Sequence, residues 1–270
     1  MKNSSSKDTV KNAKKAFFVG IGGISMASLA RYFKATGRAA CGSDRTESAA
    51  TRSLRNDGID VFIGHRAENI DGCDLVVYTA AIPSDNPELL AAGKKNVPTL
   101  TRAEFLGALM ADYRVRIGIS GSHGKSTATA MAAKLMLDAG RDPTVMCGAD
   151  TAEMGGAYRI GANKRDFLFE ACEYRDSFLS LTPNVAVLLN VDLDHTDYFD
   201  GIDSVVRSFK KFARISSDDG GAVIACADDA GAMRAAEDEF AITFGVDNES
   251  DYRPGWASCG RRPHHTRSRS

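Results

Sequence analysis

A glycine-rich turn between a strand-like run and a helix-like run most constrains how this chain can fold. The turn reads Gly-Ile-Ser-Gly-Ser-His-Gly-Lys-Ser-Thr at 118–127, after an apolar run at 115–119 and before a helical pattern at 128–139. Glycines in such a turn let backbone N–H groups approach phosphate oxygens closely. The lysine after the turn can contact the β- and γ-phosphates, and the hydroxyl after the lysine can coordinate Mg²⁺. The sequence therefore predicts an ATP site made by Gly121, Ser122, His123, Gly124, Lys125, Ser126 and Thr127.

This loop is a shortened version of the usual phosphate-loop pattern. Ile119 occupies the position where the longer pattern has its first glycine, so what remains is Gly-x-x-Gly-Lys-Ser-Thr. A glycine turn beside a surface lysine is the alternative. The strand before the turn and the helix after it favour the nucleotide site.

Composition excludes several other classes of protein. The chain has 270 residues, which is long enough for two domains, and its net charge of −1 indicates no general attraction to nucleic acid or anionic membranes. The six cysteines contain no Cys-x-x-Cys pair, so neither a zinc site nor a disulfide framework is expected. This cysteine usage favours a cytoplasmic location. The uncharged stretch 16–30 could pass for a signal peptide, but glycines interrupt it where a strand would turn into a helix.

Apolar runs alternate with helical patterns along the chain, which predicts an α/β fold with mostly parallel strands. We expect a Rossmann-like domain over 1–112 and a P-loop-type mononucleotide-binding domain over 113–252. The expected strands are 16–19, a second strand ending at Asp44, 60–63, 75–78, 97–100, 115–119, 167–172, 185–190 and 222–225. The expected helices are 24–36, 47–57, 87–95, 102–110, 128–139 and 204–215.

The composition changes abruptly in the last segment. Residues 253–270 contain five arginines and two histidines but no acid, and no apolar periodicity continues there. We expect this irregular basic tail to be disordered, or to derive from an out-of-frame or vector sequence, so that the second domain is truncated. A basic nucleic-acid-binding tail is the alternative.

A second glycine-rich turn lies between the first expected strand and helix. It contains Gly20, Gly22, Gly23, Ile24, Ser25 and Met26, with Ser25 where a dinucleotide fingerprint has its third glycine. Asp44 ends the next strand, 24 residues after Gly20. A diphosphate could rest on this helix N-terminus, with a sugar hydroxyl on Asp44. A nicotinamide oxidoreductase or a turn without ligand would fit the same pattern.

Acidic residues follow two later strands. Glu170 and Glu173 close the expected strand beside the phosphate loop, where a carboxylate could hold Mg²⁺. Because residues three apart in a strand point to opposite faces, we expect only Glu173 to face the metal. The run 190–197, Asn-Val-Asp-Leu-Asp-His-Thr-Asp, places His195 among acids at another strand end. His195 could ligate a cation or contact a phosphate, and Asp192 or Asp194 could orient it.

Taken together, four motifs resemble the Mur ligases of peptidoglycan synthesis. They are Gly-x-Gly-Gly-x-Ser-Met, Gly-Ser-His-Gly-Lys-Ser-Thr, Glu-Ala-Cys-Glu and Asn-x-x-x-Asp-His-x-Asp, and the resemblance spans about 16–252. His123 and the turn Thr79-Ala80-Ala81-Ile82-Pro83 are similar to the branch that joins L-alanine to UDP-N-acetylmuramate. A branch that adds a tripeptide to the same nucleotide sugar is the alternative.

The resemblance implies a role for each motif. The γ-phosphate of ATP would pass to the muramic carboxylate, and the amine of L-alanine would then displace phosphate from that acyl phosphate. Lys125 and His195 would be catalytic. Ser126 or Thr127, together with Glu173, would hold a first Mg²⁺. His195 would support a second metal, and Asn190 and Asp194 would shape the loop that carries His195. The UDP-sugar would contact Gly20, Gly22, Gly23, Ile24, Ser25, Met26, Asp44, Thr79, Ala80, Ala81 and Ile82.

The resemblance also implies what this chain could lack. Members of the family have three domains, and the motifs end inside the second. A further domain would need roughly 100–150 residues. We therefore expect little or no ligase activity from residues 1–270, and a non-catalytic fragment that binds nucleotide and UDP-sugar is the alternative.

Overall fold

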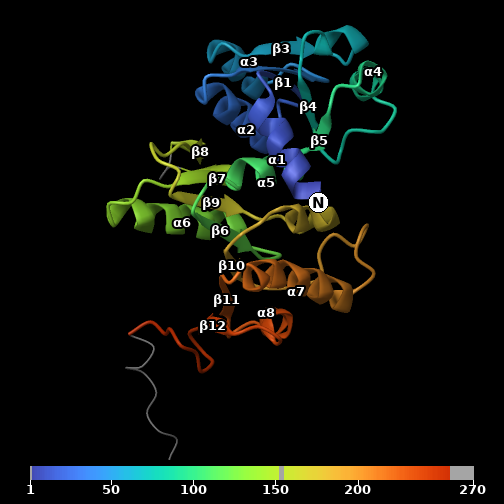
Figure 1. The fold of residues 1–270 in the computed structure, drawn as a ribbon. Coiled ribbons are helices and arrows are strands. Elements are labelled where there is room, and N and C mark those ends of the chain that lie inside the picture. The colour runs from blue at the N-terminus through green and yellow to red at the C-terminus, as the bar shows by residue number, and fades with distance from the viewer. Residues whose placement is uncertain (1, 152–154, 256–270) are drawn as a thin grey trace, which may run out of the picture.

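The computed structural model describes residues 2–151 and 155–255. These contain two sheets, one in the upper and one in the lower part of the molecule (Figure 1). Every strand pair in the first sheet is parallel. In spatial order this sheet contains β3 (Asp60–Ile63), β2 (Ala39–Asp44), β1 (Lys15–Val19), β4 (Leu75–Tyr78) and β5 (Thr99–Thr101). The predicted α/β fold with mostly parallel strands is confirmed.

The second sheet has seven strands and one antiparallel pair, β7 with β8, at its edge. In spatial order it contains β12 (Ala241–Phe244), β11 (Ala222–Cys226), β10 (Val185–Leu188), β6 (Val115–Ser120), β9 (Asp166–Glu170), β7 (Thr144–Thr151) and β8 (Gly156–Arg159). Strand β6 lies between β9 and β10, and all three run in the same direction. Their carboxyl ends therefore meet at one edge of the sheet, which is where ligands of open α/β sheets bind.

Helices connect the strands and cover both sheets (Figure 1). They are α1 (Lys2–Asn12), α2 (Ile24–Ala35), α3 (Ala49–Asn56), α4 (Pro87–Lys95), α5 (Arg102–Met110), α6 (Lys125–Asp138), α7 (Ile202–Asp218) and α8 (Ala230–Ala236), with 3-10 turns η1 (Ala67–Ile70) and η2 (Tyr174–Ser180). Among residues 2–151 and 155–255, no helix is long and apolar enough to cross a membrane. Most of the expected basic tail, 256–270, lies outside the described residues.

Some boundaries differ from the sequence-based expectations at the ends that matter most. Helix α6 begins at Lys125 rather than at 128, β9 ends at Glu170 rather than at 172, and β10 ends at Leu188 rather than at 190. The earlier ends of β9 and β10 lengthen the irregular chain after these strands, whereas the earlier start of α6 shortens the phosphate loop. The edge pair β7 and β8 was not expected, because polar and glycine positions weaken its alternation of apolar and polar residues.

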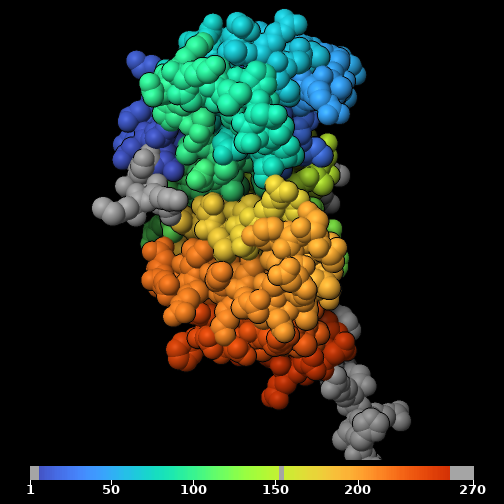
Figure 2. All heavy atoms as spheres, turned by 90° about the vertical axis from the view of Figure 1, so that its right-hand side faces the viewer, coloured from blue at the N-terminus to red at the C-terminus, as the bar shows by residue number. Residues whose placement is uncertain are grey.

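A single hydrophobic cluster joins the two sheets. It includes Phe33 of α2 and Phe105 of α5 as well as Phe167 and Phe169 of β9. The ring of Phe105 in α5 lies 5.8 Å from that of Phe33 in α2 and 5.5 Å from that of Phe18 in β1, so α5 packs against both elements. Figure 2 shows the upper and lower parts of the molecule meeting across a broad contact.

A chain of buried hydroxyls crosses the same boundary. The hydroxyl of Tyr32 in α2 lies 2.9 Å from that of Tyr113, which lies 3.0 Å from Thr144 Oγ1 in β7. Burial is the main cause that raises the pKa of Tyr32 far above its usual range, so this phenol remains protonated and able to donate. The polar groups in this part of the core are thereby satisfied.

Replacing Phe105 with alanine tests the shared core. Phe105 is fully buried, so Phe105→Ala should lower the free energy of unfolding by about 3–5 kcal/mol in urea titrations. Phe240→Ala is the matched control, because Phe240 is fully exposed and its loss should change stability by less than about 0.5 kcal/mol. Equal effects of the two substitutions would contradict the shared core.

Candidate nucleotide and metal site

The loop between β6 and α6 has the backbone conformation that a phosphate-binding turn requires. Gly124 has φ of 76° and caps α6, and Gly121 has φ of 154°. A Cβ atom at Gly121 would lie 3.0 Å from the Cβ of Leu189 and 3.3 Å from the backbone nitrogen of Asn190. Glycine is needed at 121 because the loop after β10 packs directly against it.

Side chains from the β10 loop hold the phosphate loop in place. Asn190 Oδ1 accepts the backbone N–H of His123 at 2.8 Å, and its amide donates to the His123 carbonyl at 3.1 Å. Ser122 Oγ donates to the carbonyl of Asp192 at 3.1 Å and accepts the Asp192 N–H at 2.9 Å. His123 Nε2 lies 3.7 Å from Asp192 Oδ2 at the exposed rim. The two loops therefore form one rigid unit.

Lys125 lies at the centre of this unit. Its Nζ donates to the carbonyl of Gly121 at 2.6 Å and to that of Ser122 at 3.1 Å. It also lies 3.0 Å from Oε2 of Glu173, with only 12% and 2% of the two side chains exposed. This buried ion pair and the two carbonyl contacts fix the position of the ammonium within the loop.

Glu173, Asp194 and His195 offer ligand atoms that all lie within 4.8 Å of one another. Glu173 Oε2 is buried and accepts no hydrogen bond, although Lys125 is close to it. The backbone N–H of His195 donates to Asp194 and is the main cause that lowers the pKa of this carboxyl. An orphaned carboxylate oxygen, an ionised aspartate and an imidazole fit a divalent cation.

The conformation of His195 is unusual for its residue type. Its φ of 53° lies in the left-handed region, which a non-glycine residue rarely adopts. The ring packs against Tyr174 with 4.7 Å between centroids, and its Nε2 lies 3.6 Å from Glu173 Oε1. Local strain of this kind is found where the surroundings fix a functional side chain.

Both glutamates of Glu-Ala-Cys-Glu reach the phosphate loop, so the expectation of opposite faces was wrong. Because β9 ends at Glu170, Glu173 is outside the strand and the alternation no longer applies. Glu170 Oε2 accepts the Ser126 hydroxyl at 2.7 Å and the Gly148 N–H at 2.8 Å. Of the two hydroxyls considered for the metal, Ser126 faces this carboxylate, whereas the Thr127 side chain is exposed.

The first glycine loop and its expected partners also come together. The backbone N–H of Gly22 donates to Asp44 Oδ2 at 2.9 Å, and a Cβ at 22 would lie 2.8 Å from that oxygen. A cavity of about 520 Å³ lies beside Gly20, Asp44, Ala81 and Ile82, with His65 in its wall. The turn 79–81 lines a second cavity of about 410 Å³, which is also lined by Cys172 and Tyr174 after β9.

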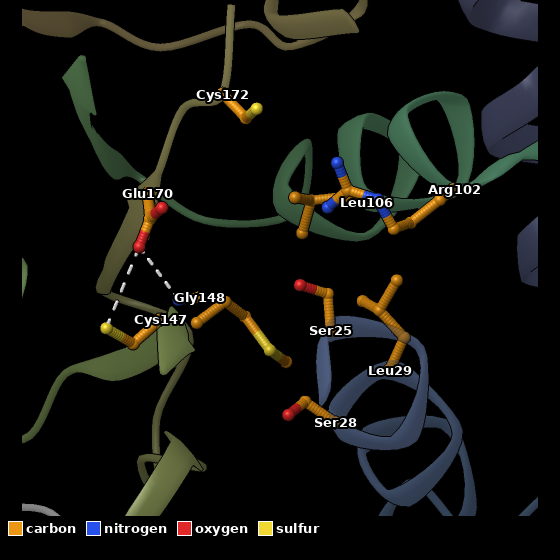
Figure 3. Close-up of a pocket in the computed structure, with 10 residues that line it drawn as sticks. Ser25, Ser28, Leu29, Arg102, Leu106, Cys147, Gly148, Glu170 and Cys172 are labelled. Carbon is orange, nitrogen blue, oxygen red and sulfur yellow. Dashed lines mark hydrogen bonds between the residues drawn. The ribbon is translucent and has the colours of Figure 1, made fainter. Parts of the chain in front are cut away.

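The other residues expected to contact the sugar nucleotide lie at the start of α2 and differ in exposure. Gly23 and Ile24 are exposed, whereas the Met26 side chain is buried in the hydrophobic cluster and cannot reach a ligand. Ser25 lines a cavity of about 210 Å³ between the two sheets, opposite Glu170 (Figure 3). This cavity connects the first glycine loop with the phosphate-loop edge.

Sequence reasoning missed Arg102 and Cys172, which line both the 210 Å³ and the 410 Å³ cavities, and His65. Burial is the main cause that raises the pKa of the Cys172 thiol, and the positive charges of Lys125 and Arg102 oppose that effect. Arg102 is the first residue of α5, and it is far from either glycine loop in the sequence. No local pattern could therefore have placed it in the cleft.

Comparison with known proteins gives the family of this chain. Residues 15–114 match the family described as "Mur ligase family, catalytic domain". Residues 119–262, more than half of the chain, match "Mur ligase middle domain", and this match continues past 252, where we expected the resemblance to end. The chain belongs to the Mur ligase family.

Several curated relatives of this chain share a name. "UDP-N-acetylmuramate--L-alanine ligase" of Clostridium beijerinckii is 49% identical over 207 residues, covering 77% of this chain and 45% of the relative. The protein of the same name from Clostridium novyi is 44% identical over 239 residues, covering 88% and 52%. The chain thus spans about half the length of the curated relatives it matches.

Solved structures show the same fold. UDP-N-acetylmuramate-alanine ligase MurC from Thermotoga maritima superimposes with a TM-score of 0.77 at 29% identity, over 88% of this chain and 54% of that one. A UDP-N-acetylmuramate:L-alanyl-gamma-D-glutamyl-meso-diaminopimelate ligase from Neisseria also has a TM-score of 0.77, at 24% identity, over 86% of this chain and 77% of that one. At that identity the second likeness shows the fold alone.

Replacing Asn190 tests whether the contact between the two loops supports nucleotide binding. Asn190→Ala removes both hydrogen bonds to His123 and should weaken ATP binding by up to roughly 30-fold in calorimetric titrations, since about 1 kcal/mol is typical of each bond. Asn163→Ala, at an exposed loop position, is the control and should leave the affinity unchanged. Unaltered ATP affinity in Asn190→Ala would show that the loop holds its shape without this clamp.

Replacing Glu173 tests the metal cluster. Glu173→Gln removes one of the two carboxylate charges of the cluster and should weaken Mn²⁺ binding in the presence of ATP by roughly tenfold or more, measured by electron paramagnetic resonance. Glu170→Gln is the matched control. Because Glu170 already accepts two hydrogen bonds, its substitution should affect Mn²⁺ less. A larger loss in Glu170→Gln would move the metal site to Ser126 and Glu170.

Proposed function

We propose that this chain binds MgATP at the phosphate loop and UDP-N-acetylmuramate at the first glycine loop, as part of an ATP-dependent ligase that adds L-alanine. The substrates are taken from the names of the curated relatives, which the chain matches over half their length. The proposal places the sugar nucleotide on 1–112 and ATP on 113–252. A ligase that consumes ATP and a nucleotide sugar would work in the cytoplasm.

One observation carries this proposal. The carboxyl ends of β6, β9 and β10 bring Lys125, Glu173 and His195 together. The 210 Å³ cavity is lined by Glu170, at the end of β9, and by Ser25 in the first turn of α2. In this proposal, the phosphate-binding centre and the first glycine loop would face one cleft. Such a cleft suits the transfer of a phosphoryl group to a second substrate better than the simple hydrolysis of ATP.

The residues have distinct tasks in the proposed reaction. Lys125 and the N–H groups of the loop would hold the β- and γ-phosphates. Glu173, Asp194 and His195 would hold a Mg²⁺ ion, which neutralises charge on the phosphates, and Ser126 with Glu170 borders the same space. The substrate carboxylate would displace ADP from the γ-phosphorus, and the L-alanine amine would then displace phosphate from the acyl carbon and lose a proton.

Substitution of Lys125 tests the proposal in two steps. The chain should bind ATP with Mg²⁺ and, separately, UDP-N-acetylmuramate in calorimetric titrations. Lys125→Met should weaken ATP binding at least tenfold and leave UDP-N-acetylmuramate binding unchanged, because the two sites lie on different sheets. Lys134→Met, on the exposed face of α6, is the control.

Turnover is then measured as phosphate release that requires an amine substrate. Release with L-alanine supports the complete proposal, and release only with the tripeptide would transfer it to the peptide-adding branch. Binding of both nucleotides without turnover would limit this chain to substrate binding. Failure to bind either nucleotide would contradict the proposed function.

A further inference from the structure

Arg102 is the cation at the junction of the two inter-sheet cavities. It is the first residue of α5, and its side chain lines both the 210 Å³ cavity and the 410 Å³ cavity. Figure 3 shows its guanidinium extending from the helix toward the side of the cavity where Glu170 and Cys172 lie. The side chain is half-buried, and among the described residues it makes no hydrogen bond or ion pair.

The acids near Arg102 are engaged with other groups. Glu104 accepts the N–H and the hydroxyl of Thr101 in a capping box, each at 2.9 Å. Glu170 accepts from Ser126 and from the Gly148 N–H. A partly desolvated guanidinium without a counter-ion is unfavourable, so its position is best explained by an anionic ligand.

The walls of the two cavities indicate which anion this is. Ser25 and the turn 79–81 come from the proposed sugar-nucleotide side, and Glu170 and Cys172 come from the phosphate-loop side. An anion on Arg102 would therefore lie between the two substrates. The one anionic group of UDP-N-acetylmuramate that must approach ATP is its carboxylate.

We propose that Arg102 binds the carboxylate of the sugar nucleotide and positions it toward the phosphate loop. The inference rests on the proposed function and adds a specificity-determining residue to it. The planar guanidinium can hold a carboxylate through two parallel hydrogen bonds, which fixes its direction as well as its place. It would also offset the repulsion between that carboxylate and Glu170 and Glu173, which carry the same charge.

A pair of ligands isolates this contact. UDP-N-acetylglucosamine shares the nucleotide and the sugar but lacks the carboxylate. Only the affinity for UDP-N-acetylmuramate should therefore depend on Arg102. In calorimetric titrations, Arg102→Gln should weaken the binding of UDP-N-acetylmuramate roughly 10- to 100-fold. It should change the affinity for UDP-N-acetylglucosamine less than about twofold. Arg102→Lys keeps the charge without the fork and should recover part of the loss.

Two controls separate this effect from charge and folding. Arg114→Gln also removes one positive charge, at the opposite end of β6, where the side chain is exposed. It should change the affinity for neither sugar nucleotide. The melting temperature of Arg102→Gln should equal that of the unsubstituted chain, because Arg102 makes no hydrogen bond or ion pair within the described structure.

The outcomes distinguish this inference from the proposed function. If Arg102→Gln weakens both sugar nucleotides equally, or neither, the carboxylate contact is overturned while the sugar-nucleotide site stands. If the unsubstituted chain binds neither sugar nucleotide, the proposed function fails at that site and the inference fails with it.

Discussion

The hydrophobic cluster shared by the two sheets determines where everything else lies. Helices α2 and α5 contribute to one core together with β9, so the sheets are joined by packing and not only by the connecting chain. The hydroxyl chain from Tyr32 through Tyr113 to Thr144 adds directional contacts at the same boundary. Close-packed interiors resist small displacements, and the width of the cleft is therefore a property of the core.

The charged residues of the candidate site lie mostly in the irregular chain that follows three strands. Strands β6, β9 and β10 end at one edge, and the residues that follow them supply the charged groups. Because the strands are short and the loops are pinned by Asn190 and Ser122, side chains far apart in sequence converge without a long ordered segment. The sheet fixes the positions of the loops, and the loops carry the function.

Much of this arrangement could be predicted from the sequence because its determinants are local. The bounds of α4 and α5 were predicted correctly, and the structure shows strong start signals there: proline at the first position of α4 and a capping box at Thr101. The glycine loops were recognisable for the same reason. The hairpin of β7 and β8 has no such signal and depends on pairing with β9.

The contents of the cleft could not be predicted in this way. Whether Glu173 reaches the phosphate loop together with Glu170 depends on where β9 stops, and a strand end is set by the packing of its neighbours rather than by its own residues. Arg102 enters the cleft only because α5 packs between two sheets. Its role therefore becomes visible only when the tertiary structure is known.

The ion pair between Lys125 and Glu173 makes the two charges of the site interdependent. Both side chains are largely buried, so neither can lose its partner without a penalty in free energy. A phosphate that draws Lys125 away leaves Glu173 in need of a positive partner, and a cation that occupies Glu173 frees Lys125 for a phosphate. Phosphate and cation must then bind cooperatively, and by thermodynamic reciprocity each raises the affinity of the other by the same factor.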